Sequence, residues 1–206
     1  MKNVWKRLAA ALLCGVLLLP FSACGNDSSK AEESMGVSSS ADSGVQGEKL
    51  PLTDLTVIPE NTYSEATLVC DSIVVEAGSK KIPYRVLLYN NPGFGFVGLR
   101  LSYEDPLTPY MDEEKGKDEM EVTLGTAMNG FMVSCMNSPQ QKLIGAAGFA
   151  GSDCEFDGAM FTCYFDIPAD APSGTVYDFS LEVVDFRPMD GENHEVKTVK
   201  GSITVQ

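Results

Sequence analysis

The chain after residue 50 is a series of short apolar segments that alternate with polar positions and are separated by turn residues. The segments occupy residues 72–77, 82–90, 95–104, 131–137, 142–150, 159–168, 175–186 and 195–205. Turn pairs such as Asn129-Gly130 and Asp157-Gly158 stand between them. No long segment has the 3.6-residue periodicity of an amphipathic helix. About eight or nine strands without helical crossovers predict an all-β domain, either a β-sandwich or a jelly roll.

The first two of these segments are separated by a short polar stretch, Gly78-Ser79-Lys80-Lys81. A few residues containing Gly between two apolar runs are typical of a β-hairpin. We therefore expect residues 72–77 and 82–90 to pair with each other.

The N-terminus has the features of an export signal, which we assign to residues 1–23. A basic head precedes an apolar run at residues 8–19, which is too short to span ~30 Å of hydrocarbon as a helix. Ser22-Ala23-Cys24 then resembles the bacterial lipobox, although Phe21 stands where the pattern prefers Leu. That resemblance implies that Cys24 is acylated and that the exported protein is anchored to the outer face of the cell membrane. Ordinary signal cleavage is the alternative.

Residues 24–50 are rich in Ser and contain no aromatic side chain. Such a composition cannot bury enough apolar surface to offset the entropy of ordering the chain. We expect a flexible tether here, followed by a single domain at residues 51–206.

The chain is acidic, with 15 Lys and Arg against 29 Asp and Glu and a net charge of −14. Loss of the basic signal would leave the remainder more acidic still. Nucleic acid is excluded as a partner, because phosphate binding requires clustered cations.

Three ordered motifs resemble the cohesin family. In residues 99–109 a strand ends at Tyr103-Glu104-Asp105 and a Leu follows shortly after; residues 157–174 contain Asp-Gly, a strand, Ala and Gly; and residues 201–205 read Gly-Ser-Ile-Thr-Val. Their order and spacing extend the resemblance across residues 68–206, which are most similar to the divergent cohesins of ruminococcal cellulosomes. The resemblance implies a nine-stranded jelly roll that binds dockerin modules, has no enzymatic activity and needs no cofactor. Any Ca²⁺ would belong to the dockerin.

The resemblance places the partner on one sheet, to which residues 95–103 contribute. Alternation along this segment directs Val97, Leu99, Leu101 and Tyr103 into the core. It leaves four residues facing outward: Phe96, Gly98, Arg100 and Ser102. The better-known cohesins carry Asn and Asp where this chain has Phe96 and Gly98, so the dockerin should differ as well. The alternative is that Phe96 covers the end of the sandwich and Arg100 is a solvated charge.

A second segment of the same sheet, residues 131–137, allows two registers that differ by one residue. We expect Phe131, Val133 and Cys135 to face inward. The outward side chains are then Met132, Ser134 and Met136, and flexible thioethers suit a partner helix. A shift by one residue would instead place the methionines in the core.

Four cysteines remain after the signal and Cys24 are set aside: Cys70, Cys135, Cys154 and Cys163. They contain no Cys-x-x-Cys motif and His194 is the only His, so a zinc site is poorly supported. In an exported protein, four cysteines can form disulfides in three alternative pairings. We expect at most one or two disulfides. The alternative is that the thiols are free and buried.

Two acidic stretches could be mistaken for functional sites. The charge run at residues 112–119 is typical of a solvated loop. In residues 185–195, aligning Gly191 with the glycine of an EF-hand puts Phe186 and Pro188 where oxygen ligands are needed. We therefore predict no metal site and a turn at Asp190-Gly191.

Other functions remain as alternatives to the cohesin hypothesis. A catalytic triad cannot be argued from a single His beside a turn. A carbohydrate-binding module of jelly-roll type could use exposed tyrosines to bind polysaccharide, although the only Trp lies in the signal. A lipid-anchored adhesion or structural domain is the third possibility.

Overall fold

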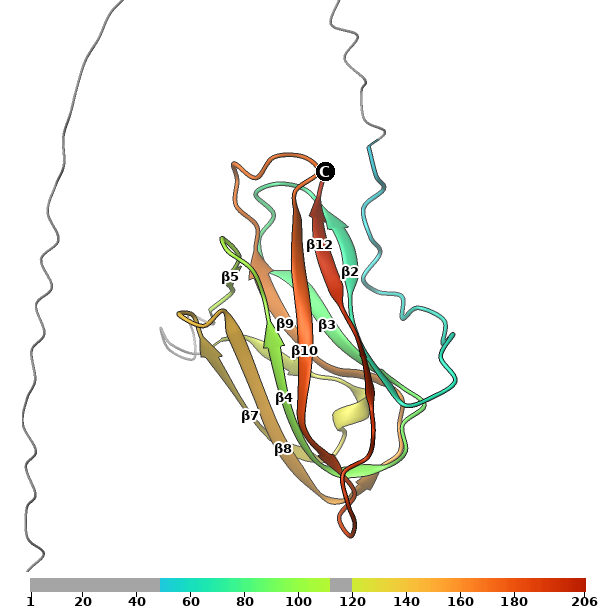
Figure 1. Ribbon diagram of the computed structural model, residues 1–206. Helices are drawn as coiled ribbons and strands as arrows, with labels where there is room; N and C mark the ends of the chain where they lie inside the picture. The colour runs from blue at the N-terminus through green and yellow to red at the C-terminus, as the bar shows by residue number, and fades with distance from the viewer. Residues whose placement is uncertain (1–48, 112–119) are drawn as a thin grey trace, which may run out of the picture. The chain divides into compact units, whose positions relative to one another are not determined.

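The computed structural model describes residues 49–111 and 120–206, in which two β-sheets pack face to face (Figure 1). The first sheet contains β1 (Thr67–Cys70), β3 (Ile82–Tyr89), β5 (Thr108–Pro109), β6 (Val122–Leu124), β9 (Gly158–Asp166) and β11 (Lys197–Val199). The second contains β2 (Ser72–Val75), β4 (Phe94–Ser102), β7 (Phe131–Ser138), β8 (Leu143–Cys154), β10 (Val176–Arg187) and β12 (Gly201–Val205). A short 3₁₀ helix, η1, spans Thr126–Met128. The predicted β-sandwich is confirmed.

The strand order is β11-β1-β3-β9-β5 in the first sheet, where β6 also pairs with β9, and β2-β12-β10-β4-β8-β7 in the second. The described residues thus form twelve strands instead of the expected nine. Several are only two to four residues long, and the expected strand at residues 195–205 is broken in two.

The chain passes from one sheet to the other at two adjacent points, Asp71 and Lys200. Asp71 separates β1 from β2, and Lys200 separates β11 from β12. The strands on either side pair in parallel, β1 with β11 and β2 with β12. At the crossing, the Ser202 amide donates to the Asp71 carbonyl at 3.0 Å. A Cβ at Gly201 would overlap that carbonyl, so the crossing requires glycine.

The expected hairpin across residues 78–81 is wrong, because β2 and β3 lie in different sheets. β2 pairs with β12, while β3 pairs with β1 and β9. The turn signal is real: Gly78 has a φ of 75° and its amide donates to the Pro168 carbonyl. It connects two sheets instead of two paired strands.

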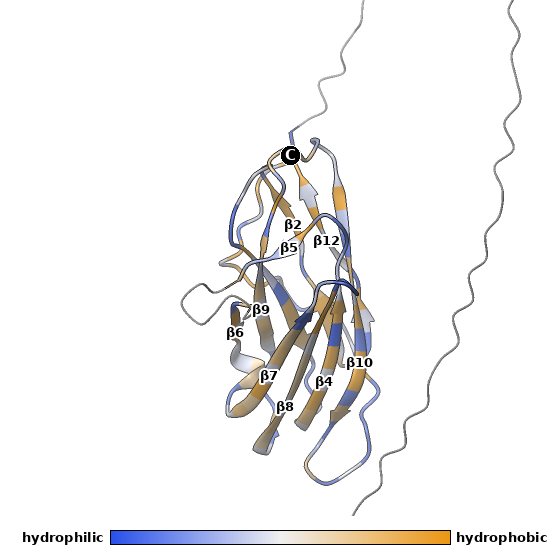
Figure 2. Cartoon of the chain, turned by 90° about the vertical axis from the view of Figure 1, so that its left-hand side faces the viewer, coloured by the Kyte–Doolittle hydropathy of each residue, from blue (hydrophilic) through white to orange (hydrophobic). Residues whose placement is uncertain are grey.

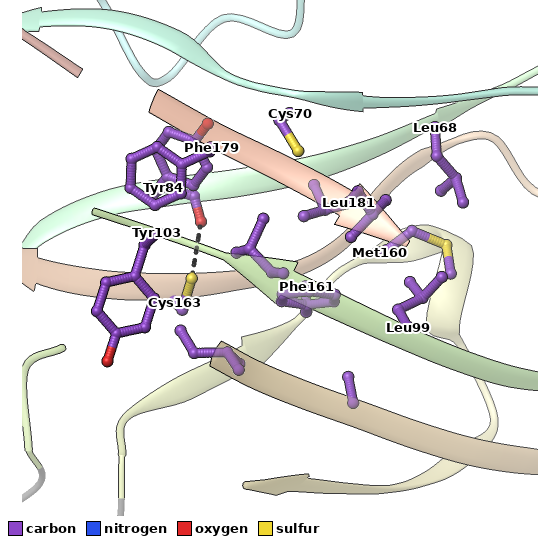
Figure 3. Packing of buried hydrophobic residues seen from close by; sticks show 14 of the residues in the cluster. Leu68, Cys70, Tyr84, Leu99, Tyr103, Met160, Phe161, Cys163, Phe179 and Leu181 are labelled. Atoms are coloured by element: carbon purple, nitrogen blue, oxygen red, sulfur yellow. Dashed lines mark hydrogen bonds between the residues drawn. The ribbon is translucent and has the colours of Figure 1, made fainter. Parts of the chain in front are cut away.

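One hydrophobic core fills the space between the sheets (Figure 3). Tyr84 stacks on Phe179 with ring centroids 3.9 Å apart, and the Cys163 thiol donates to the Tyr84 carbonyl at 3.6 Å. The core and everything packed against it lie between Leu55 and Val205. Residues 46–206 are one compact unit that contains this whole core, so this piece should fold independently.

Residues 53–59, here called the strap, are fixed on the first sheet by a buried ion pair. Arg85 Nε donates to Asp71 Oδ2 at 2.7 Å, and Arg85 Nη2 donates to Asp71 Oδ1 at 3.1 Å. Arg85 Nη1 donates to the Leu55 and Val57 carbonyls at 2.9 and 3.0 Å. The guanidinium therefore holds the strap against the domain.

The four cysteines of the domain are free, so the expectation of a disulfide is wrong. Cys70 lies on β1 and Cys163 on β9, and β3 runs between these strands. Two strand spacings are about 10 Å, more than a disulfide can bridge. Cys135 on β7 lies opposite Ala146 near the start of β8, whereas Cys154 is the last residue of β8. These two cysteines are therefore too far apart to form a disulfide. The thiols act as small hydrophobes, and burial raises the pKa of Cys70 to about 12.

Several sequence predictions fall outside the described residues. They are the signal peptide, Cys24, nearly all of the tether and the charge run at residues 112–119. Within the described residues, no helix is both long enough and apolar enough to cross a membrane.

Candidate functional site

The candidate site is the outward face of β7, β8, β4 and β10, which lie side by side in Figure 2. Strand β4 alternates as expected, with Val97, Leu99, Leu101 and Tyr103 buried. The four outward positions are half-buried or exposed: Phe96, Gly98, Arg100 and Ser102. This orientation is confirmed, and their role in binding a partner stays a prediction.

The register of β7 is also confirmed. Met132 and Met136 are 64% and 72% exposed, and Ser134 between them is exposed as well. Phe131 is buried, and the alternative that places the methionines in the core is wrong. Phe131 packs on Phe94 with ring centroids 4.9 Å apart, which fixes the inward set of β7.

One row across this face is apolar and aromatic, and we call it the aromatic row. It runs Met132, Phe149, Phe96, Arg187 from β7 to β10, as the strand register places them. Phe149 is 48% exposed. The Arg187 guanidinium carbon lies 4.1 Å from the centroid of the Phe96 ring, in cation–π contact. Phe96 therefore lies between Phe149 and Arg187 on the outward face of the sheet.

The next row consists of small side chains and forms a trough. Its members are Ser134, Ala147, Gly98 and Asp185. Ser134, Ala147 and Asp185 of this row line a shallow hollow of about 480 Å³, together with Met132, Phe149 and Phe96 of the aromatic row. Asp185 closes one end, where its Oδ1 lies 3.2 Å from Arg187 Nε. A projecting apolar side chain of a partner would fit this hollow.

A third row carries the predicted arginine. Met136, Gly145, Arg100 and Glu182 face one another across the four strands. Arg100 Nη1 lies 3.3 Å from Glu182 Oε2, and these side chains are 51% and 64% exposed. An exposed pair of this kind contributes about 0–1 kcal/mol. Arg100 is thus available to a partner, because releasing it from Glu182 breaks only a weak ion pair.

All seven predicted partner-binding residues lie on this one face. Sequence reasoning missed Phe149, Arg187, Glu182 and Asp185, which the register places among them. The sequence does contain a signal for Phe149. Ile144 is buried, and since successive side chains of a strand point to opposite faces, Phe149, five residues later, points outward. The β10 residues are harder to find, because the register of β10 shifts between Val183 and Asp185.

The described residues contain no group of three or more His, Cys, Asp or Glu side chains that could hold a metal ion. His194 Nε2 lies 2.9 Å from the Gly93 carbonyl, where it ties the turn after β10 to the start of β4. Its place in the fold is structural.

Comparison with known proteins identifies the fold. No family model and no curated protein matches the sequence. Among solved structures, a non-cellulosomal cohesin from the hyperthermophilic archaeon Archaeoglobus fulgidus superposes with a TM-score of 0.57 and 18% identity, over 69% of this chain and 92% of that one. The domain has a cohesin-like fold.

Two bacterial cohesins give similar values. A type I cohesin in complex with a dockerin, from Clostridium thermocellum, has a TM-score of 0.56 and 16% identity, over 68% of this chain and 99% of that one. A type III cohesin module from a cell-surface anchoring scaffoldin of Ruminococcus flavefaciens has a TM-score of 0.55 and 16% identity, over 68% and 87%. The cohesin-like part of this chain therefore matches almost the whole of each module.

Proposed function

We propose that this protein is a non-catalytic, surface-anchored cohesin that binds dockerin modules through the face formed by β7, β8, β4 and β10. The single observation that carries the proposal is the aromatic row with its adjoining trough, on a domain of cohesin-like fold. Several of the structural neighbours are cohesins in complex with dockerins, which supports this class of partner.

The chemistry of the face supports a protein partner. Phe149, Phe96 and Met132 present apolar surface next to Arg187, and aromatic, Met and Arg side chains are enriched at protein interfaces. They stand on paired strands, so little conformational entropy is lost when a partner binds. The hollow beside them gives a rigid shape for a partner side chain to fill.

The charges of the face are largely compensated. Arg100 pairs with Glu182 and Arg187 with Asp185. Specificity should therefore depend mainly on the shape of the aromatic row and trough. Phe96 and Gly98 replace the Asn and Asp of the better-known cohesins, so the dockerin partner should carry apolar side chains at the matching positions. The Ca²⁺ requirement of binding would come from the dockerin.

The proposed location follows from the N-terminal sequence. Acylation at Cys24 would hold the exported protein on the outer face of the membrane, because each buried CH₂ of an acyl chain contributes roughly 0.8 kcal/mol. The tether to residue 50 would then lift the domain from the surface. Such an arrangement suits recruitment of dockerin-bearing enzymes or scaffold subunits for polysaccharide degradation.

The test is binding of residues 46–206 to a panel of dockerins from the source organism, by calorimetric titration with Ca²⁺ and then with chelator. We expect at least one dockerin to bind only with Ca²⁺. No binding to any dockerin, together with retention on cellulose or xylan, would favour a carbohydrate-binding module instead.

A further inference from the structure

Strand β7 is the outermost strand of the second sheet and pairs with β8 alone over Phe131–Ser138. Apart from these pairs, no backbone hydrogen bond joins residues 131–137 to any described segment. Within the described ranges, its outer edge thus presents a row of amide and carbonyl groups without backbone partners, which is a template for another strand.

The other sheet edges in the described part of the chain are protected. The strap covers β2, since the Thr53 amide donates to the Val74 carbonyl and Val74 donates to Thr53 Oγ1 at 2.7 Å. β5 is two residues long and includes Pro109, and β6 is three residues long. β11 is also three residues long and begins with Lys197. Short length, proline and lysine are the usual means of preventing edge pairing.

β7 has none of these protections. Its sequence, FMVSCMNS, contains no charged residue and no proline. Its eight residues pair with β8 in continuous register, without a bulge to twist the edge away. An exposed edge of this length and apolarity is expected to pair with another strand.

We propose that β7 pairs with β7 of a second copy of this chain, antiparallel and centred on Ser134. In this register Ser134 faces Ser134 of the second copy, Met132 faces Met136, and Val133 faces Cys135. The opposed pairs between residues 132 and 136 are uncharged and similar in kind, Phe131 faces the uncharged Asn137, and the side chains of each pair lie on the same side of the sheet. Centring on Cys135 would instead place Met136 opposite Ser134 and Val133 opposite Asn137.

The partner is a second copy because the strand complements itself in sequence and carries no charge to repel its own image. Pairing would join two six-stranded sheets into one continuous sheet. The proposed docking faces of both copies would then lie side by side, and one dimer would present two of them. The interface is small, so the dimer should be weak and reversible.

The first test measures the mass of residues 46–206 by sedimentation equilibrium, with reductant, between about 10 and about 500 µM, a range suited to weak interfaces. We expect a reversible monomer–dimer equilibrium. Ser134→Lys should weaken it at least about tenfold, because like charges directly opposite each other destabilise a strand pair. Ser102→Lys adds the same charge to a central strand of the same face and should leave the dimer intact.

A monomer at every concentration would overturn the proposal. This holds even if the edge of β7 pairs with an extended segment of another protein instead of with a second copy. Equal effects of Ser134→Lys and Ser102→Lys would overturn it as well. Far-ultraviolet circular dichroism and thermal melting would establish that both variants are folded. Since dimerisation is measured without a dockerin, failure here is distinguishable from failure of dockerin binding.

The second test fixes the register by disulfide cross-linking in a Cys135→Ser background. Ser134→Cys should cross-link rapidly to itself, because directly opposed Cβ atoms lie about 5 Å apart. Met136→Cys alone should cross-link slowly, since its two copies would be four residues, or about 13 Å, apart along the strands. A mixture of Met132→Cys and Met136→Cys should again react rapidly. Similar rates for all three would contradict the register.

Discussion

Replacement of Arg85 by Ala should severely destabilise the domain. The side chains of Arg85 and Asp71 are only 10% and 4% exposed, and they form two hydrogen bonds of 2.7 and 3.1 Å. Arg85→Ala would leave the Asp71 carboxylate buried with only the amide of residue 85 as a donor, at 3.1 Å. Removing one partner of a buried ion pair costs about 3–5 kcal/mol. At about 2–4 °C per kcal/mol for a domain of this size, Tm should fall by roughly 6 to 20 °C.

The assay is equilibrium urea unfolding and thermal melting of residues 46–206. Arg100→Ala is the matched control, because Arg100 also pairs with a carboxylate but is 51% exposed. Its free energy of unfolding should change by less than about 1 kcal/mol. Removing both Asp71 and Arg85 should cost less than the sum of the two single changes.

The strap provides a second measurement of the same variant. Arg85 Nη1 holds the Leu55 and Val57 carbonyls, so Arg85→Ala should release residues 53–59 to limited proteolysis under conditions in which the domain stays folded. Equal destabilisation by Arg85→Ala and Arg100→Ala, with an uncut strap, would refute this account of the ion pair.

Two further predictions concern the crossing between the sheets and the buried thiols. Gly201→Ala should lower the free energy of unfolding by about 1–3 kcal/mol, because the added Cβ would overlap the Asp71 carbonyl; unchanged urea unfolding would contradict the close approach. Burial raises the pKa of Cys70 from 9.0 to about 12 and raises that of Cys163. The folded domain therefore retains thiol protons that the unfolded chain loses, so the thiol contribution to stability should be constant well below pH 9.0 and fall above it, by up to about 1.4 kcal/mol per pH unit for each thiol. Urea unfolding between pH about 8 and about 11 measures this, and Cys70→Ala should reduce the slope; equal stability across the range would contradict it.

The sequence was sufficient to predict the sandwich and the face of two strands. Alternation decides which side of β4 and β7 is buried, and both registers are as expected. The alternation of apolar and polar residues carries no information on which strand pairs with which. The turn at residues 78–81 therefore resembled a hairpin although it connects two sheets, and the break at Lys200 was invisible because its cause, the carbonyl of Asp71, lies far away in sequence.

The candidate site was predicted in part for the same reason. Phe96 and Met132 were found on their own strands, but Phe149 joins them only through the pairing of β8 with both neighbours. Arg187 reaches Phe96 after a register shift in β10, which no local pattern indicates. The expected disulfide failed because strand order, and not the number of cysteines, decides which thiols are close enough to pair.

The most direct test of the proposed function compares two phenylalanines by calorimetric titration with a dockerin that binds in Ca²⁺. Phe149 is 48% exposed in the aromatic row, whereas Phe156 is 62% exposed beside Leu124 in a separate hollow. Phe149→Ala should weaken binding by about 1–3 kcal/mol, which is roughly 5- to 150-fold, as expected of an aromatic side chain at the centre of an interface. Phe156→Ala should leave the affinity unchanged. Wild-type affinity in Phe149→Ala, or an equal loss in both variants, would contradict the assignment of the dockerin to this face.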